Sequence, residues 1–499
     1  MLEQIINTTA QFLKNMPKEK RKKKGQFFTS KETAKFMANL FDFNNFNGII
    51  NILDPGAGTG ILTAAFVDNI STLKNITKLN ITCYENDFDV LPILKQNLAF
   101  IKNNANIKID YQIIEEDYLL SQANDFEKNL LANKNLIKYD AVIGNPPYLK
   151  IMRDNRIALS MPTVIHGTPN LYFLFASMSL FNLKENKEMV YIIPRSWTSG
   201  EYFKAFRKYF LTNGKLQHIH LFSSRDKVFS QEQVLQETII IKVKKTSVAT
   251  NNIIITSSQS NNDFNNITYI EVPYNSVVTG KNMYVFLPTN ESELNTIQKI
   301  NKYSQTLPEV GYRMRTGIVV DFRQKNELRE EPGKNIIPLF YSQHIKNGRV
   351  HHEASGKDAD WIIDSKPELI QPNENYVFCK RFTTKEENRR LQCGIYLSKD
   401  FPQYNYIGTQ NKINYINRVD CSPLKNDEVY GIYALLNSTL FDQYYRILNG
   451  STQVNSTEIN SIPVPSAEVI KNIGTRLIKM GGLSTELCNK IIEEEAYCE

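Results

Sequence analysis

The sequence predicts an α/β protein with a doubly wound, mainly parallel sheet in its amino-terminal half and a separate α+β domain in its carboxyl-terminal half. From about residue 31 to 245, short β-rich runs alternate with stretches of helical periodicity, which is the pattern of a sheet with helices on both faces. A glycine-rich turn follows the first strand. Beyond Thr246 the chain becomes rich in Asn, Ser and Thr, and the alternation does not resume. The predicted domains are therefore residues 1–245 and 246–499.

Each element of the first domain has its own local signal. The strands are short apolar runs bounded by Gly, Pro or acidic residues, and the helices repeat apolar residues every three or four positions. Helices are expected at residues 31–41, from about 61, and at 89–101, 171–183 and 202–214. Strands are expected at 48–54, 81–85, 107–117, 138–144, 188–194, 215–222 and 237–245. The last two strands are expected to add an antiparallel edge.

Composition narrows the class of protein. A chain of 499 residues with 41% hydrophobic and 22% charged residues is typical of a globular protein with several buried cores. No apolar run approaches the ~20 residues that span a bilayer, and the amino terminus lacks the order of a secretory signal. The six cysteines are scattered without CxxC pairs, which argues against a zinc site. A cytoplasmic protein with no membrane partner is expected.

The first strand runs into the glycine-rich turn DPGAGTG at residues 54–60. Gly56, Gly58 and Gly60 would let the backbone approach a ligand without hindrance from a Cβ atom. The spacing is not the dinucleotide-binding GxGxxG, and it is not a Walker loop because no Gly-Lys-Ser/Thr follows. By itself the turn is also compatible with an ordinary tight connection between a strand and a helix.

Acidic residues end the second and third strands. Glu85 is placed to accept hydrogen bonds from both hydroxyl groups of a ribose. Asp117 could accept one from the amino group of an adenine, with Tyr118 against the ring. Because the carboxyl ends of parallel strands meet at one edge of a sheet, these residues together describe a nucleoside site. The absence of a phosphate loop predicts a cofactor without phosphates.

The fourth strand ends in the sequence GNPPY at residues 144–148. Prolines cannot continue a sheet ladder, so Asn145 to Tyr148 are expected to form a stiff loop beside the nucleoside site. The side-chain oxygen of Asn145 and the backbone carbonyl of Pro146 can both accept hydrogen bonds from one amino group. Two such acceptors localise the lone pair of an aromatic amine on its nitrogen, while Tyr148 would stack on the ring. The loop therefore favours chemistry on a planar ring amine.

The ordered set GQFFTS, DPGAGTG, YEND, EEDY, GNPPY and NLYF resembles the γ-class adenine-N6 DNA methyltransferases of bacterial restriction-modification systems. The carboxyl-terminal stretches TGIVVDFR and ALLNSTLFDQYYRILNGSTQVNSTEINSIPVP are similar to the PstI/BsuBI-like modification methylases. The resemblance spans nearly the whole chain. It implies a Rossmann-like, S-adenosylmethionine-dependent methyltransferase fold in the first domain and a DNA target-recognition role for the second.

The resemblance also implies a role for each motif. The glycine turn and the GQFFTS segment would hold the methionine part of S-adenosylmethionine, and the second and third strand ends would hold its ribose and adenine. The residues implied in cofactor binding are Thr29, Asp54, Gly56, Gly58, Gly60, Glu85, Asp117 and Tyr118. Those implied in catalysis are Asn145, Pro146, Pro147, Tyr148 and Phe229. In that set Tyr148 and Phe229 would sandwich the target base.

The implied activity is site-specific transfer of a methyl group to N6 of an adenine in double-stranded DNA, which protects the site from a cognate restriction endonuclease in the bacterial cytoplasm. The adenine has to flip out of the duplex, at a cost of a few kcal/mol. Direct transfer from a sulfonium needs no metal. The alternatives are methylation of RNA adenine, of cytosine N4 in DNA or of a protein glutamine amide, and a catalytically inactive DNA-binding specificity protein.

The second half of the chain interleaves basic and aromatic residues, and the whole protein has a net charge of +7. Lys and Arg neutralise phosphates, while Arg, Asn and Gln read base edges. The candidate cations for such contacts are Arg313, Arg315, Arg323, Lys380, Arg381, Lys385, Arg389 and Arg390. For any one of them a solvated surface position is the simpler interpretation, so the sequence assigns no individual contact.

Overall fold

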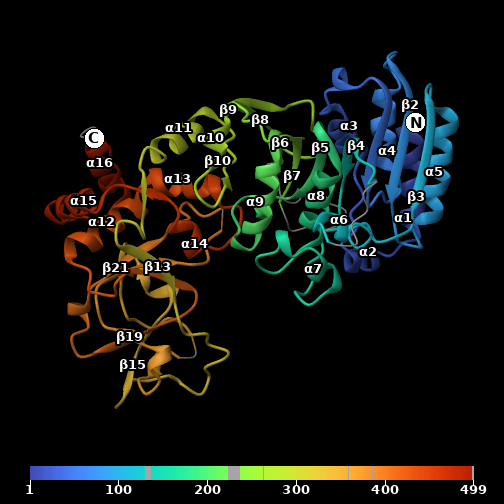
Figure 1. Cartoon of the computed structure of the whole chain (residues 1–499). Helices are drawn as coiled ribbons and strands as arrows, with labels where there is room; N and C mark the ends of the chain where they lie inside the picture. Colours follow the sequence, from blue (N-terminus) through green and yellow to red (C-terminus); the bar gives the residue numbers. More distant parts are fainter. Residues whose placement is uncertain (130–135, 223–236, 262, 358, 385, 497–499) are drawn as a thin grey trace. The chain divides into compact units, whose positions relative to one another are not determined.

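The computed structural model describes residues 1–129, 136–222, 237–261, 263–357, 359–384 and 386–496. The chain divides into two compact units, Met1–Asn290 and Glu291–Glu499 (Figure 1). The boundary predicted after residue 245 lies inside the first unit. The reason is that two further strands beyond it join the same sheet, although the composition of the chain changes there.

The first unit is built on a nine-stranded sheet with the order β3-β2-β1-β4-β5-β7-β6-β8-β9. The strands from β3 to β5 in this order run parallel, and β7 is antiparallel to both of its neighbours. The doubly wound α/β fold is therefore confirmed. The place predicted for the antiparallel edge is wrong, since β7 lies between β5 and β6, and β9 forms the edge. The strands of this sheet are β1 Gly48–Pro55, β2 Ile76–Tyr84, β3 Lys108–Ile114, β4 Tyr139–Gly144, β5 Leu183–Pro194, β6 Gly214–Phe222, β7 Thr238–Lys245, β8 Asn252–Ser258 and β9 Thr268–Pro273. A separate pair is formed by β10 Val278–Thr279 and β11 Tyr284–Val285.

Helices cover both faces of this sheet, which explains why its central strands are apolar throughout instead of alternating. On β5, Val190 and Ile192 join the core that contains the apolar residues of α3 and α4. Tyr191 between them points to the other face, where its hydroxyl lies 2.5 Å from Ser179 Oγ on α8. The helices of this unit are α1 Leu2–Lys14, α2 Lys18–Lys24, α3 Lys31–Asn39, α4 Ile61–Ile70, α5 Leu91–Asn104, α6 Ala123–Phe126, α7 Arg156–Ser160, α8 Leu171–Asn182, α9 Lys204–Asn213 and α10 Tyr274–Val277.

The second unit is an α+β structure, as the sequence predicts. A six-stranded sheet has the order β13-β23-β20-β21-β17-β16, and a five-stranded sheet has the order β14-β18-β15-β22-β19. The bounds are α11 Glu291–Ile300, β12 Gln305–Thr306, β13 Tyr312–Thr316, β14 Leu328–Arg329, β15 Ile336–Phe340, β16 Ile345–Lys346, β17 Arg349–Val350, β18 Trp361–Ile363, β19 Gln371–Pro372, β20 Tyr376–Lys380, β21 Cys393–Tyr396, β22 Tyr406–Thr409, β23 Ile413–Arg418, α12 Asn426–Asn437, α13 Thr439–Leu448, α14 Ser456–Ile459, β24 Pro463–Val464, α15 Ala467–Met480 and α16 Thr485–Ala496. Within the described ranges, none of the helices has the length and apolar character needed to cross a bilayer.

The register of the parallel strands places their carboxyl ends at one edge. Asp54 of β1 pairs with Cys83 of β2, and Leu53 pairs with Val142 of β4. The strand order reverses between β1 and β4. In open α/β sheets the crevice outside such a reversal is where ligands bind, so the fold brings the ends of β1, β2 and β4 together at the expected position of a site.

Candidate active site

A cavity of about 500 Å³ is formed in the first unit by residues that follow β1, β2, β3 and β4, together with the segment after α2. Eight of the predicted site residues line it, namely Thr29, Gly56, Gly58, Glu85, Asp117, Tyr118, Asn145 and Pro147. Four others, Asp54, Gly60, Pro146 and Tyr148, do not line it. Phe229 lies outside the described residues, so its predicted role stays a prediction.

The glycine turn after β1 requires glycine because its backbone is left-handed. The φ angles are +69° at Gly56, +56° at Gly58 and +83° at Gly60, a region that costs other residues roughly 1–2 kcal/mol each. Glu85 at the end of β2 closes the turn, since its Oε2 accepts a hydrogen bond from the backbone N–H of Gly58 at 2.9 Å. The turn and the tip of β2 therefore form one wall of the cavity.

Glu85 is held in a fixed position by backbone groups. Its Oε1 accepts a second hydrogen bond, from the N–H of Asp87 at 2.9 Å, and the residue is only 8% exposed. Burial raises the pKa of this carboxyl group above its ordinary value. Since a carboxylate has about four acceptor sites, the hydrogen bonds from the backbone leave some acceptor capacity for a ligand. This capacity suits the pair of ribose hydroxyls predicted for Glu85.

Asp54 lies behind the turn and not in the cavity. It is 1% exposed, and its Oδ2 accepts a hydrogen bond from the hydroxyl of Thr63 at 2.7 Å. Burial raises the pKa of Asp54 from 3.8 to about 7. Asp54 therefore supports the turn from within the core and does not line the cavity.

We expect the Asp54→Asn substitution to flatten the pH dependence of stability. Burial disfavours the charged carboxylate, so between pH 4 and 7 the folded protein binds a proton that the unfolded chain has released. The contribution of Asp54 to stability is thus present at low pH and is lost as pH rises toward 7. Urea unfolding at pH 5 and pH 8 should show a larger loss of unfolding free energy in the wild type than in the variant. Parallel pH profiles would contradict this assignment.

The segment before α3 forms the opposite wall of the cavity and is tied to the tip of β2. Lys24 Nζ lies 2.7 Å from Asp87 Oδ1, and Gln26 Nε2 donates to Asp87 Oδ2 at 2.8 Å. Because a carboxylate only accepts hydrogen bonds, the Gln26 amide must turn its nitrogen to Asp87. Its buried oxygen has no partner among the described residues, and Gln26 lines the cavity. The basic run Lys18–Lys24 thus forms helix α2, and its last residues, Lys23 and Lys24, line the cavity.

The side chain of Asn145 has one orientation that its surroundings allow. Its Nδ2 donates to the backbone carbonyl of Phe27 at 2.7 Å and to Thr29 Oγ1 at 3.1 Å. A backbone carbonyl cannot donate, so Phe27 decides which end of the amide is nitrogen. The Asn145 Oδ1 atom is buried and makes no hydrogen bond in the described part of the chain. Asn145 therefore lines the cavity with its amide in a fixed orientation, and its predicted role as an acceptor stays a prediction.

Tyr148 connects the GNPPY loop to the rest of the unit. Its backbone N–H donates to the carbonyl of Gly25 at 2.9 Å, and its hydroxyl donates to the carbonyl of Ile192 at 3.0 Å. The ring lies 5.4 Å from that of Phe27 and 6.3 Å edge-on from that of Tyr172. Burial raises the pKa of this phenol well above its ordinary value. Stacking of Tyr148 on a base stays a prediction, because the ring packs beside the cavity.

Asp117 and Tyr118 continue the wall after β3. Asp117 Oδ1 accepts from the backbone N–H groups of Leu119 and Leu120, both at 2.9 Å. The Tyr118 hydroxyl lies 3.1 Å from Ser179 Oγ and accepts from Asn182 Nδ2 at 3.1 Å. Its phenol oxygen is thus bound inside the core, and the residue reaches the cavity while only 3% exposed.

The structure also places residues in the site that the sequence motifs do not single out. Phe88, three positions after Glu85, lines the cavity and is 82% exposed. Phe28 and Phe175 line it as well. An aromatic residue in an otherwise polar turn, as in ENDFD, is a signal that points to Phe88. For Phe175, within the apolar helix α8, the sequence has no signal that separates it from a core residue.

Comparison with known proteins finds relatives along nearly the whole chain. The family model described as "Eco57I restriction-modification methylase" matches residues 66–229. The type II methyltransferase M.BsuBI of Bacillus subtilis is 35% identical over 91% of this chain and 90% of its own length. M.PstI of Providencia stuartii is 36% identical over 92% of this chain and 90% of its own length.

One solved structure has a similar fold over most of the chain, including residues of both units. The type IIL restriction-modification enzyme MmeI, in complex with DNA, aligns with a TM-score of 0.51 at 13% identity, over 90% of this chain and 67% of that chain. Such a likeness at low identity concerns the fold alone. The identity to M.BsuBI and M.PstI is above 30% over about nine-tenths of each chain, which is enough to show membership of a family. The chain belongs to the family of type II methyltransferases that includes M.BsuBI and M.PstI.

Proposed function

We propose that this protein transfers a methyl group from S-adenosylmethionine to N6 of an adenine flipped out of double-stranded DNA. The observation that carries the proposal is the side chain of Asn145, a residue that lines the cavity and is oriented by the Phe27 carbonyl, and whose buried Oδ1 has no hydrogen-bond partner among the described residues. A cavity of about 500 Å³ is within the range of sites for small ligands.

The residues present fit the proposed cofactor. Glu85 keeps acceptor capacity for a ribose hydroxyl beside its bonds to the backbone, and Phe88 offers an exposed aromatic face for a purine. The free Gln26 oxygen is an acceptor suited to an ammonium group. When bound, S-adenosylmethionine supplies an electrophilic methyl group on its sulfonium. Asp117 and Tyr118 would hold the adenine part of the cofactor, and Thr29 the methionine carboxyl group.

The protein's own contribution to the reaction is to orient the target amine. Asn145 Oδ1 accepts one hydrogen of the exocyclic amine, and we assign the second hydrogen to the Pro146 carbonyl. Both contacts favour a tetrahedral nitrogen, whose localised lone pair can attack. As the new N–C bond forms, the bond from the methyl carbon to the cofactor's sulfur would break and its electron pair would leave with the sulfur. The nitrogen then sheds one proton to solvent, so no strong base is required. Because the Asn145 side chain is held in place by the Phe27 carbonyl before the substrate arrives, little reorganisation of this acceptor is needed in the transition state.

The second unit and the relatives support duplex DNA as the substrate. The family model names a restriction-modification methylase, and the second unit is large enough to select a site. Site-specific modification of this kind would protect DNA from a cognate endonuclease. Methylation of RNA adenine or of a protein glutamine would leave the role of the second unit unexplained. Methylation of cytosine N4 is the closer rival, since the same acceptors fit its amine.

The proposal is tested by identifying the methylated nucleoside. Purified protein is incubated with labelled S-adenosylmethionine and plasmid DNA, and the DNA is digested and analysed by mass spectrometry. We expect N6-methyladenine at one recurrent sequence, which base-resolved sequencing of DNA from expressing cells would locate. Label on cytosine, or label on RNA with none on duplex DNA, would overturn the assignment to DNA adenine.

A further inference from the structure

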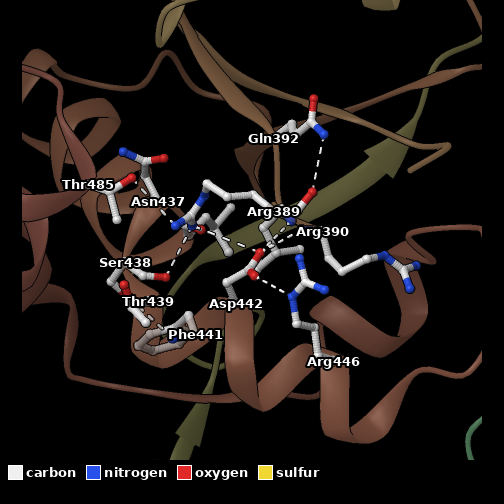
Figure 2. A network of polar contacts seen from close by, with 12 residues as sticks. Arg389, Arg390, Gln392, Asn437, Ser438, Thr439, Phe441, Asp442, Arg446 and Thr485 are labelled. Carbon is white, nitrogen blue, oxygen red and sulfur yellow. Dashed lines mark hydrogen bonds and ion pairs between the residues drawn. The ribbon is translucent and has the colours of Figure 1, made fainter. Parts of the chain in front are cut away.

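Two of the basic residues that the sequence singles out in the second unit are used inside the fold. Figure 2 shows a network of polar contacts in which Arg389 and Arg390 lie near the carboxylate of Asp442. Asp442 Oδ1 accepts from the backbone N–H of Arg390 at 2.8 Å, and the Arg390 side chain is fully buried. Arg389 donates to the carbonyls of Leu436 and Ser438, both at 3.1 Å. The Arg390 guanidinium donates to Thr383 Oγ1 at 3.1 Å. Both side chains thus have partners inside the fold, so we do not assign them to a ligand.

Other arginines of this unit also have internal partners. Arg381 donates to the Asn411 carbonyl at 2.9 Å, Arg418 pairs with the buried Glu428, and Arg476 pairs with Glu495 at 2.8 Å. These contacts explain their positions without any ligand. Lys385 lies outside the described residues.

Arg313 and Arg315 differ from this group. They stand two residues apart on β13, on the opposite face from the buried Tyr312 and Met314. Arg313 is exposed and makes no hydrogen bond or ion pair with any residue that the structure describes. Arg315 donates only to uncharged groups, to Asn417 Oδ1 at 3.2 Å and to Cys421 Sγ at 3.9 Å. Two positive charges therefore share one strand face, and no carboxylate among the described residues forms an ion pair with either of them.

These arginines line a groove of about 440 Å³ between β13 and α14, which lie beside each other in Figure 1. Ser456 and Thr457 at the start of α14 line the other side. No hydrogen bond of either hydroxyl group occurs among the described residues. The groove thus combines two guanidinium groups with two hydroxyl groups, all of which can donate to an anion.

The groove is rigidly built. The Asn460 side chain pairs with both backbone groups of Met314, accepting from its N–H at 2.8 Å and donating to its carbonyl at 2.9 Å. Glu458 of α14 is 2% exposed and accepts from the Tyr445 hydroxyl at 2.9 Å. The Asn460 contacts join the residue after α14 to β13, and the Glu458 contact joins α14 to α13. The two sides of the groove therefore have a fixed separation before any ligand binds.

We propose that this groove, formed by Arg313, Arg315, Ser456 and Thr457, binds a backbone phosphodiester of the DNA duplex. The proposal rests on the proposed function, because it takes duplex DNA to be the substrate. Arginine forks and hydroxyl groups are frequent partners of phosphate oxygens. Contacts of this kind position the duplex and carry no sequence information. The groove would thus place the DNA on the second unit for residues that read the bases elsewhere.

The test measures duplex binding against salt concentration by fluorescence anisotropy, with Arg313→Ala, Arg313→Lys and Arg315→Ala in the full chain. Each loss of a phosphate contact should reduce the slope of log K against log salt by about 0.9. Affinity should fall alike for duplexes with and without the methylation site. Arg313→Lys should keep the slope, because a lysine also neutralises a phosphate. Arg329→Ala, at an exposed arginine bonded to the carbonyls of Asn326 and Leu328, is the matched control and should behave as wild type.

Each outcome decides the proposal. An unchanged slope in Arg313→Ala, or a loss confined to the duplex that contains the site, overturns phosphate binding by the groove. Binding of S-adenosylmethionine and the melting temperature should be unaffected in the variants, since Arg313 is exposed and the groove belongs to the second unit. If the wild type methylates DNA but the slope persists, only the groove proposal fails. If the wild type neither binds nor methylates duplex DNA, the proposed function fails with it.

Discussion

Replacing Asn145 with alanine should lower the turnover number by about 10²- to 10³-fold, while the affinity for S-adenosylmethionine changes little. The reason is that Asn145 Oδ1 is the free acceptor at the cavity, and an acceptor that acts on the target amine contributes mainly in the transition state. Single-turnover transfer of a labelled methyl group gives the rate, and calorimetry gives the affinity for the cofactor. Turnover near that of the wild type would contradict the acceptor role.

Two variants sharpen this experiment. Asn145→Asp cannot donate to the Phe27 carbonyl, which lies 2.7 Å from Asn145 Nδ2, so the loop should lose its orientation and turnover should also fall. Asn170→Ala removes another nearby asparagine, whose Oδ1 accepts from the N–H of Tyr172 at the start of α8. Loss of such a cap should lower stability by about 1 kcal/mol without a comparable loss of rate. The pair separates loss of the acceptor from loss of stability.

The Gly25→Ala substitution should both destabilise the protein and abolish most of its activity. Gly25 ends α2 with φ +66°, and an alanine Cβ there would lie 2.9 Å from the carbonyl carbon of Tyr148. Backbone atoms cannot give way as a flexible side chain can, so the segment after α2 would have to move. That segment includes Phe27, whose carbonyl orients Asn145. Urea denaturation and methyl transfer should report the two losses.

Gly48→Ala is the matched control for Gly25→Ala. Its φ angle is +69°, but the space around its Cβ position contains no atom within 4 Å. Gly48→Ala should therefore show only the backbone cost of roughly 1–2 kcal/mol, with normal turnover per folded molecule. Gly25→Ala should lose a further 1–3 kcal/mol or so from the clash. Equal destabilisation by the two substitutions would show that the contact with Tyr148 is unimportant.

Much of the candidate site was predictable because many of its residues belong to short, contiguous sequence motifs. The strand that ends in GNPPY and the turn DPGAGTG determine their own backbone through proline and glycine, so local sequence was sufficient. Gly56, Gly58, Asn145 and Pro147 of these two motifs line the cavity. Asp54 shows the limit of such prediction. It belongs to the motif, yet its side chain turns into the core toward Thr63, a contact that the motif alone does not specify.

The sequence by itself determined the kinds of elements, their order and the chemical groups at the strand ends, because periodicity and turn chemistry act over a few residues. Only the tertiary structure decided the strand order, with β7 inserted between β5 and β6 and with β8 and β9 extending the sheet past residue 245. It also decided that Phe27 orients Asn145 across 118 residues of chain, and that Arg389 is used internally while Arg313 is not. The physical reason is that these outcomes depend on which distant groups satisfy each other's hydrogen bonds and charges once the core is packed.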